Sequence, residues 1–132
     1  MGRVTTVLAA LILSGCSTTG GNLSHPATVV RNCGYTDGGG YDISIDMGDR
    51  DISIHADGPP NGGEWRSGSE LRILVCDRRL DQCTRPSSGS LRVFRQTRNK
   101  FNGNISFELT HQSESIDFLG VVKNPEELLI CG

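Results

Sequence analysis

Residues 41–55 read YDISIDMGDRDISIH, with an apolar side chain at every second position on both sides of Gly48 and Asp49. A period of two is typical of a strand that buries one face. A Gly-Asp pair between two such runs favours a tight turn. This stretch therefore predicts an antiparallel hairpin whose other face, rich in Asp and Ser, is in water. The apolar face is expected to carry Tyr41, Ile43, Ile45, Met47, Ile52 and Ile54.

Short apolar runs of similar length follow along the chain, separated by turn-forming residues that include many of the 17 glycines. Strands are expected at residues 71–75, 91–95, 116–122 and 128–131, and residues 124–129 are the only candidate for a helical turn. Asn102-Gly103-Asn104 is interpreted as a hairpin loop that places Phe101 opposite Ile105, since this register collects the apolar residues on one face. The pattern predicts an all-β fold, a small antiparallel β-sandwich or barrel of about eight strands.

The N-terminus has a different character. Arg3 precedes an apolar run of ten residues, which is too short for the roughly 20 that span a bilayer. The run ends in Leu13-Ser14-Gly15-Cys16, which resembles the lipobox of bacterial lipoproteins. The resemblance implies a signal peptide at residues 1–15 and a lipidated Cys16 that anchors the chain in a membrane. The small polar residues that follow predict a flexible tether at 16–25, and the remaining length and alternation predict a β-rich domain at 26–132.

Ser17 follows the lipidated position, where Asp would retain an enteric lipoprotein at the inner membrane. The resemblance therefore implies an outer-membrane lipoprotein in a host that uses this rule, with its domain in the periplasm or at the cell surface. The oligomeric state is left open by the sequence.

Four cysteines remain once Cys16 is assigned to the lipid. An even number in an exported chain predicts disulfide bonds, and three pairings are possible. We favour Cys76–Cys83, across a polar hairpin loop, and Cys33–Cys131, between the first and last strands. A zinc site is disfavoured because its cysteines usually stand two to four residues apart.

Charge is unevenly distributed along the chain. Residues 37–64 carry a formal charge of −6, residues 66–100 carry +6 and residues 101–132 carry −4. Eight of the nine bases in the middle block are arginines, which favours contacts with carboxylates or phosphates, on an acidic partner or on lipid A. The alternative is neutralisation by acidic strands of the same fold. Trp65 is interpreted either as an exposed interface anchor or as a plug over one end of the fold. The candidate partner-binding residues are Trp65, Arg66, Arg92, Arg95 and Arg98.

No pattern in the sequence indicates an enzyme. His25, His55 and His111 are scattered, and no nucleophile elbow, zinc-binding helix motif or phosphate-binding glycine loop is present. Asp46, Asp49 and Asp51 lack the spacing of an EF-hand loop and are interpreted as turn residues. We expect no catalytic residue, no metal and no cofactor. An exported acidic chain is also not expected to bind nucleic acid.

The sequence therefore favours a non-enzymatic protein-binding module, such as an accessory subunit of an envelope, secretion or pilus assembly. The plan of the chain also resembles membrane-bound lysozyme inhibitors, on the lipobox, Cys33, Ser67-Gly68 and Cys131. That resemblance implies, as an alternative, an inhibitor of a cell-wall hydrolase. An enzyme is the least favoured of the three classes.

Overall fold

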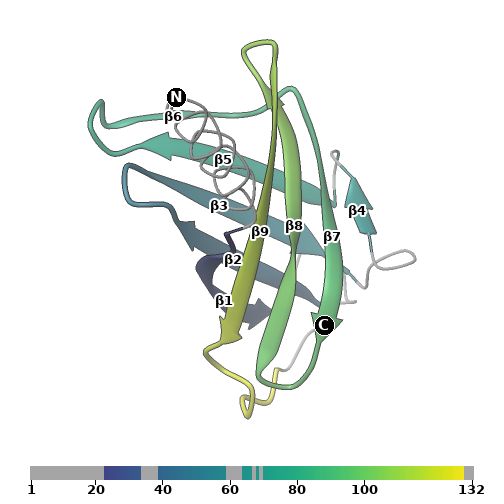
Figure 1. Cartoon of the computed structure of the whole chain (residues 1–132). Coiled ribbons are helices and arrows are strands. Elements are labelled where there is room, and N and C mark those ends of the chain that lie inside the picture. Colours follow the sequence, from purple (N-terminus) through teal and green to yellow (C-terminus); the bar gives the residue numbers. More distant parts are fainter. Residues whose placement is uncertain (1–22, 34–38, 59–63, 67, 69, 130–132) are drawn as a thin grey trace, which may run out of the picture.

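The computed structural model describes residues 23–33, 39–58, 64–66, 68 and 70–129. These residues form strands and turns without a helix (Figure 1). The strands are β1 (His25–Asn32), β2 (Gly40–Asp46), β3 (Arg50–Asp57), β4 (Glu64–Arg66), β5 (Leu71–Asp77), β6 (Gln82–Thr84), β7 (Ser88–Gln96), β8 (Lys100–Leu109) and β9 (Gln112–Val122).

All nine strands belong to one sheet in the order β4-β7-β8-β9-β1-β2-β3-β5-β6. The all-β prediction is confirmed, but the sheet is single and mixed. All nine strands lie in two antiparallel groups, β4-β7-β8-β9 and β1-β2-β3-β5-β6, and these groups join where β1 runs parallel to β9, with His25 opposite Phe118. The prediction of a small antiparallel sandwich or barrel is confirmed only in part, because the sheet is a half-barrel with one parallel pair of strands. Periodicity assigns residues to faces and does not determine which strands become neighbours.

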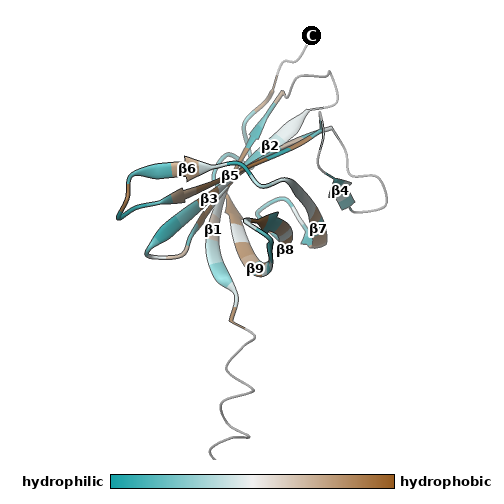
Figure 2. Cartoon of the chain, turned by 90° about the horizontal axis from the view of Figure 1, so that it is seen from above, coloured by the Kyte–Doolittle hydropathy of each residue, from teal (hydrophilic) through white to brown (hydrophobic). Residues whose placement is uncertain are grey.

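The sheet curls into a half-barrel (Figure 2), bending from β3 through β1 and β9 to β7. Ile73 on β5 approaches Gly89 on β7 so closely that a Cβ at Gly89 would lie 2.4 Å from its Cδ1 atom. The concave face therefore closes on itself and encloses the core without a second sheet. Its aromatic part comes from four strands, with ring centroids 4.7 Å apart for Tyr41–Phe101 and 6.5 Å for Phe101–Phe118.

The hairpin predicted from residues 41–55 is confirmed as β2 and β3. Ile43 pairs with Ile54 and Ile45 with Ile52, and all four side chains are buried. The turn closes with a hydrogen bond from Met47 N to Arg50 O, and Gly48 takes a φ of 88°, which favours glycine. The alternation of the sequence thus defines the concave and outer faces of this part of the sheet.

The hairpin loop expected at residues 102–104 is wrong. These residues lie inside β8, and the turn before β8 closes where Thr97 N donates to Lys100 O. Gly103 is buried, and no side chain fits there, because a Cβ would lie 2.4 Å from Arg92 O of β7. The expected apolar face still forms, since residues 101, 103 and 105 point to one side whether or not the chain turns between them.

The C-terminal part of the chain differs from expectation as well. Residues 128 and 129 are not in a strand, and 124–129 hold one turn, from Glu127 N to Asn124 O, in place of a helical turn. Arg31 N at the end of β1 donates to Asn124 Oδ1 at 2.9 Å, which fixes this segment beside the parallel strands.

One predicted disulfide is present. Cys76 and Cys83 are directly opposite each other on β5 and β6, and their Cα atoms are 4.0 Å apart. Cys131 lies outside the described residues, so the Cys33–Cys131 pair stays a prediction. Cys16, Ser17 and the region expected to be a signal peptide also lie outside them. The first strand begins at His25, one residue before the expected start of the domain.

Candidate functional site

The strand pairing brings three of the five candidate partner-binding residues to one edge of the sheet. Arg66 on β4 pairs in register with Ser90 on β7, and Arg92 and Arg95 follow along β7. All three side chains are exposed. We call this surface, formed by Arg66, Arg92, Phe94 and Arg95, the β4–β7 edge.

Phe94 is the residue of this edge that the sequence analysis did not single out. It lies in a bulge between Val93, opposite Gly103, and Arg95, opposite Asn102, and it is 63% exposed. The alternation of the sequence could have identified Phe94 as exposed, because Leu91 and Val93 point to the core and the next residue therefore points outward. An exposed aromatic ring between arginines has the composition of a protein-binding hot spot.

The arginines of this edge are only partly neutralised within the fold. Glu64, which is opposite Arg92 in register, approaches Arg66 Nε at 3.8 Å. Arg92 and Arg95 form no ion pair with any described residue. Two guanidinium groups beside Phe94 are therefore available to carboxylates of another molecule.

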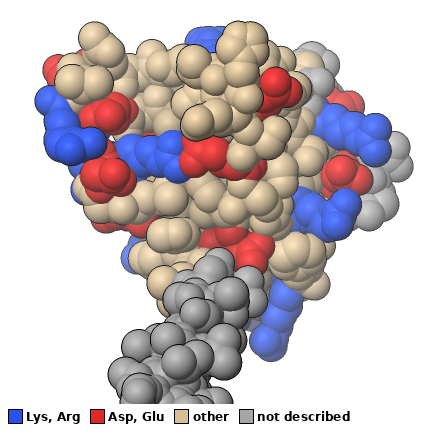
Figure 3. All heavy atoms as spheres, turned by 45° about the horizontal axis from the view of Figure 1, so that its top comes forward, with Lys and Arg blue, Asp and Glu red and all other residues tan. Residues whose placement is uncertain are grey.

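Other bases of the +6 block are engaged inside the fold. Arg78 pairs with Asp46 and Asp51, and its hydrogen bond with Asp51 lowers the pKa of that carboxyl. Arg98 pairs with Glu126 at the β7–β8 turn. Figure 3 shows acidic and basic side chains interleaved over the upper face of the molecule. Internal neutralisation, the alternative reading of the block, thus accounts for some of its arginines but not for Arg92 and Arg95.

Trp65 is not an exposed anchor. It is 1% exposed, and its Nε1 donates to Asp57 O at 3.0 Å. Its ring centroid lies 6.2 Å from those of Tyr41 and Phe101. Of the two interpretations of Trp65, the exposed anchor is wrong, because β4 adds to the edge of the sheet and turns the indole inward. Trp65 therefore supports the β4–β7 edge from beneath.

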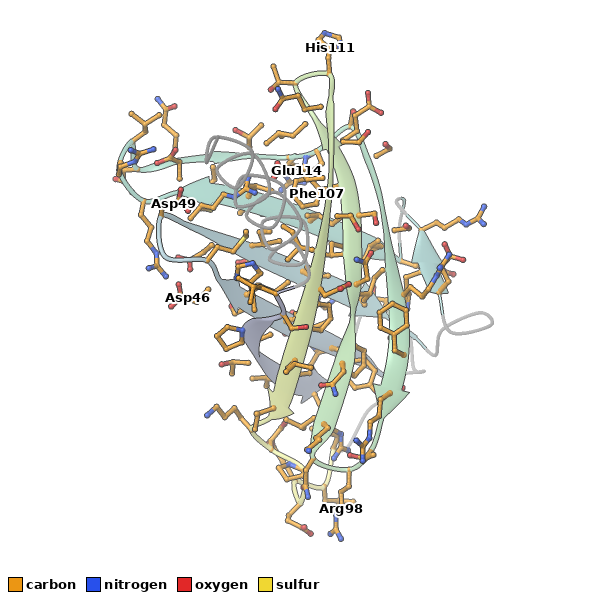
Figure 4. The ribbon with its side chains drawn as sticks, viewed as in Figure 1. Asp46, Asp49, Arg98, Phe107, His111 and Glu114 are labelled. Atoms are coloured by element: carbon orange, nitrogen blue, oxygen red, sulfur yellow. A yellow bond between two sulfur atoms is a disulfide. The ribbon has the colours of Figure 1, made fainter. Side chains whose placement is uncertain are left out.

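The histidines are not brought together. His25 starts β1, His55 is in β3, and His111 lies on the β8–β9 turn, at the opposite end of the hairpins from Arg98 (Figure 4). His55 is the most constrained of them. Its Nδ1 lies 2.7 Å from Asp42 Oδ1, and its Nε2 lies 2.8 Å from Oδ1 of the buried Asp57.

Burial lowers the pKa of His55, but hydrogen bonds and charge attraction from Asp42 and Asp57 outweigh burial and raise it. An imidazole held by a carboxylate at each nitrogen has no free lone pair for proton abstraction. This geometry gives His55 a structural role in joining β2 and β3. The adjoining outer surface holds a pocket of about 330 Å³ lined by residues that include His55, Arg72 and Arg85.

Among residues 23–33, 39–58, 64–66, 68 and 70–129, no group of three His, Cys, Asp or Glu side chains is placed to hold a metal ion. Asp46 instead accepts a hydrogen bond from Gly48 N and pairs with Arg78. The same part of the chain contains no helix of the length and hydrophobicity needed to cross a membrane.

Comparison of the chain with models of protein families, with curated proteins and with solved structures found no match. Two of the positions that carry the resemblance to lysozyme inhibitors, Ser67 and Cys131, lie outside the described residues.

Proposed function

We propose that this protein is a lipid-anchored envelope protein that binds a protein partner through the β4–β7 edge and catalyses no reaction. The single observation that carries the binding proposal is Phe94, 63% exposed in a bulge beside Arg92 and Arg95. A ring that is costly to leave in water, placed between guanidinium groups, fits a partner with an apolar pocket rimmed by carboxylates.

The paired part of β7 next to Phe94 positions the edge, and a positioned surface lowers the entropic cost of binding. Residues 90–92 of β7 are paired with β4 on one side and β8 on the other, Phe94 follows them in the bulge, and the aromatic core containing Trp65 lies beneath the paired residues. The carboxylate clamps on both nitrogens of His55 support the non-enzymatic part of the proposal.

The anchoring part rests on the Leu13-Ser14-Gly15-Cys16 motif. It is tested by mass spectrometry of the mature protein for acyl groups on Cys16. A chain that is found with an unmodified Cys16 would contradict the anchor and would leave the binding proposal in place.

The binding part is tested by affinity capture from detergent-solubilised envelopes of the native host. Phe94→Ser and Arg95→Ser are compared with Leu80→Ser, a matched control whose side chain is 65% exposed on the β5–β6 hairpin. We expect wild type and Leu80→Ser to recover the same partner in equal amounts, and the edge variants to recover about tenfold less. Equal recovery by all four proteins, with unchanged melting temperatures, would exclude this edge as the binding surface.

A further inference from the structure

Hydrophobic side chains also gather on the outer face of the sheet where β9 meets β1. Leu119 and Val121 are each 54% exposed, and Val30 is 40% exposed. The parallel register places Pro26 beside Leu119 and Thr28 beside Val121, and Val30 is the next outward residue of β1. Pro26, Val30, Leu119 and Val121 therefore form one continuous surface, which we call the β9–β1 patch. A contiguous exposed apolar surface indicates an interaction site.

Lysines border this patch. Lys100 on β8 is directly opposite Val121, and Lys123 is the next outward position after Val121 along the chain. Both are exposed, and neither forms an ion pair with a described residue. The patch thus combines aliphatic side chains with the ammonium groups of two long, flexible lysine side chains.

The nearest carboxylates on this face are engaged elsewhere. Asp42, opposite Val30, contacts Asn32 and His55. Asp117, two residues before Leu119, accepts a hydrogen bond from Asn104 Nδ2 at 2.8 Å. The lysines therefore remain the charges most open to another surface.

The chain enters the domain at this patch. β1 begins at His25, and Pro26 already belongs to the patch. Cys16 precedes His25 by nine residues, which span at most about 30 Å when fully extended. An acyl chain on Cys16 would hold this side of the domain close to the bilayer, at a high effective concentration.

We propose that the β9–β1 patch lies on the surface of a bilayer that contains anionic lipids. This inference rests on the proposed anchor at Cys16 and adds the orientation of the domain. Aliphatic side chains enter the interfacial region while Lys100 and Lys123 extend to phosphate groups, as lysines do at membrane surfaces. The patch lacks the arginines and aromatic rings that mark the β4–β7 edge, so a bilayer fits it better than a protein partner.

The test places a fluorescent reporter in the patch. Leu119→Trp is introduced into the full chain, and the purified acylated protein is reconstituted into vesicles of phosphatidylcholine with phosphatidylglycerol that carry brominated acyl chains. Leu80→Trp is the matched control, an exposed leucine on the β5–β6 hairpin. Trp65 is 1% exposed and gives the same background in both proteins.

We expect the bromolipids to quench the indole of Leu119→Trp about threefold more than that of Leu80→Trp. Adding Lys100→Glu and Lys123→Glu, or omitting phosphatidylglycerol, removes this difference. Equal quenching of the two reporters overturns the proposal. Protection of the Leu119→Trp indole from acrylamide without bromolipid quenching also overturns it, because protein would then cover the patch.

Different measurements test the proposed lipid anchor and the proposed orientation of the domain, so one proposal can fail without the other. Flotation of wild type with vesicles reports the anchor alone. If flotation fails, the same two reporters are added to preformed anionic vesicles at low salt, where selective quenching of Leu119→Trp supports the patch and its absence overturns it. Partner capture through Phe94 is independent of both results.

Discussion

Arg50 at the start of β3 and Glu114 on β9 form a two-pronged ion pair on the concave side of the sheet, although they are 64 residues apart in sequence. The register of β1 on β9 explains why an ion pair between Arg50 and Glu114 is needed at this position. β1 begins opposite Phe118, so residues 112–117 of β9 have no partner strand on that side within the described part of the chain (Figure 4 labels Glu114 there). The ion pair joins β3 to β9 beyond the end of β1.

Breaking this pair is expected to destabilise the fold. The side chains are 23% and 28% exposed, between surface and buried pairs. Glu114→Gln should therefore lower the free energy of unfolding by about 1–2 kcal/mol at neutral pH, measured by urea denaturation. Glu108→Gln, at an exposed position of β8, is the control and should have no comparable effect. Equal stability of both variants would show that the ion pair does not hold β3 to β9.

His55 makes stability depend on pH in the opposite sense from most acidic groups. Because its pKa is raised above 6.5 in the folded state, its contribution is full below pH 6.5 and is lost as the pH rises through the folded-state pKa. The stability difference between wild type and His55→Gln should shrink over that range. NMR titration of the imidazole should give a pKa above 6.5, and a lower value would contradict the clamp.

The Cys76–Cys83 disulfide should stabilise β6, an exposed edge strand of three residues. The loop that it closes is short, so replacing both cysteines by alanine is expected to cost about 2 kcal/mol. Hydrogen exchange should increase at residues 82–84 while β2 keeps its protection. Uniform loss of protection across the sheet would instead assign the disulfide a role in the core.

Gly103 should tolerate no side chain. A Cβ there would lie 2.4 Å from Arg92 O, and backbone on a paired strand cannot yield as a side chain can. Gly103→Ala is expected to lower the free energy of unfolding by about 2–3 kcal/mol. Ser53→Ala, at an exposed strand position, serves as the control. Thermal melts that leave Gly103→Ala unchanged would contradict the packing of β7 on β8.

Alternation in the sequence predicted which residues are buried better than it predicted where strands end. Ile43, Ile52 and Ile105 are buried as expected, because side-chain parity survives errors in the turns. The Asn-Gly-Asn turn signal misled because packing against Arg92 requires a glycine at position 103 inside a strand. The local sequence pattern indicates that a position requires glycine, but it does not distinguish a turn from close backbone packing as the reason.

Contacts between residues far apart in the sequence could not be predicted from local sequence patterns. Nothing near Arg50 or Glu114 in the sequence indicates that they meet, and the parallel pairing of β1 with β9 has no local signature. The β4–β7 edge was partly predictable, since Arg92 and Arg95 share a strand, whereas the addition of Arg66 through β4 depended on strand order.

The pairing of β1 with β9 also sets an order of events in folding. Strands β1, β2, β3, β5 and β6 can associate as soon as they are synthesised, but β1 gains its second neighbour only when residues 118–122 emerge. Until then, the outer edge of β1 is unpaired and open to aggregation. Joining the first strand to the last closes a long loop, which is intrinsically slow. The step that completes the half-barrel is therefore expected to limit the folding rate, and to be the stage at which a chaperone protects the chain.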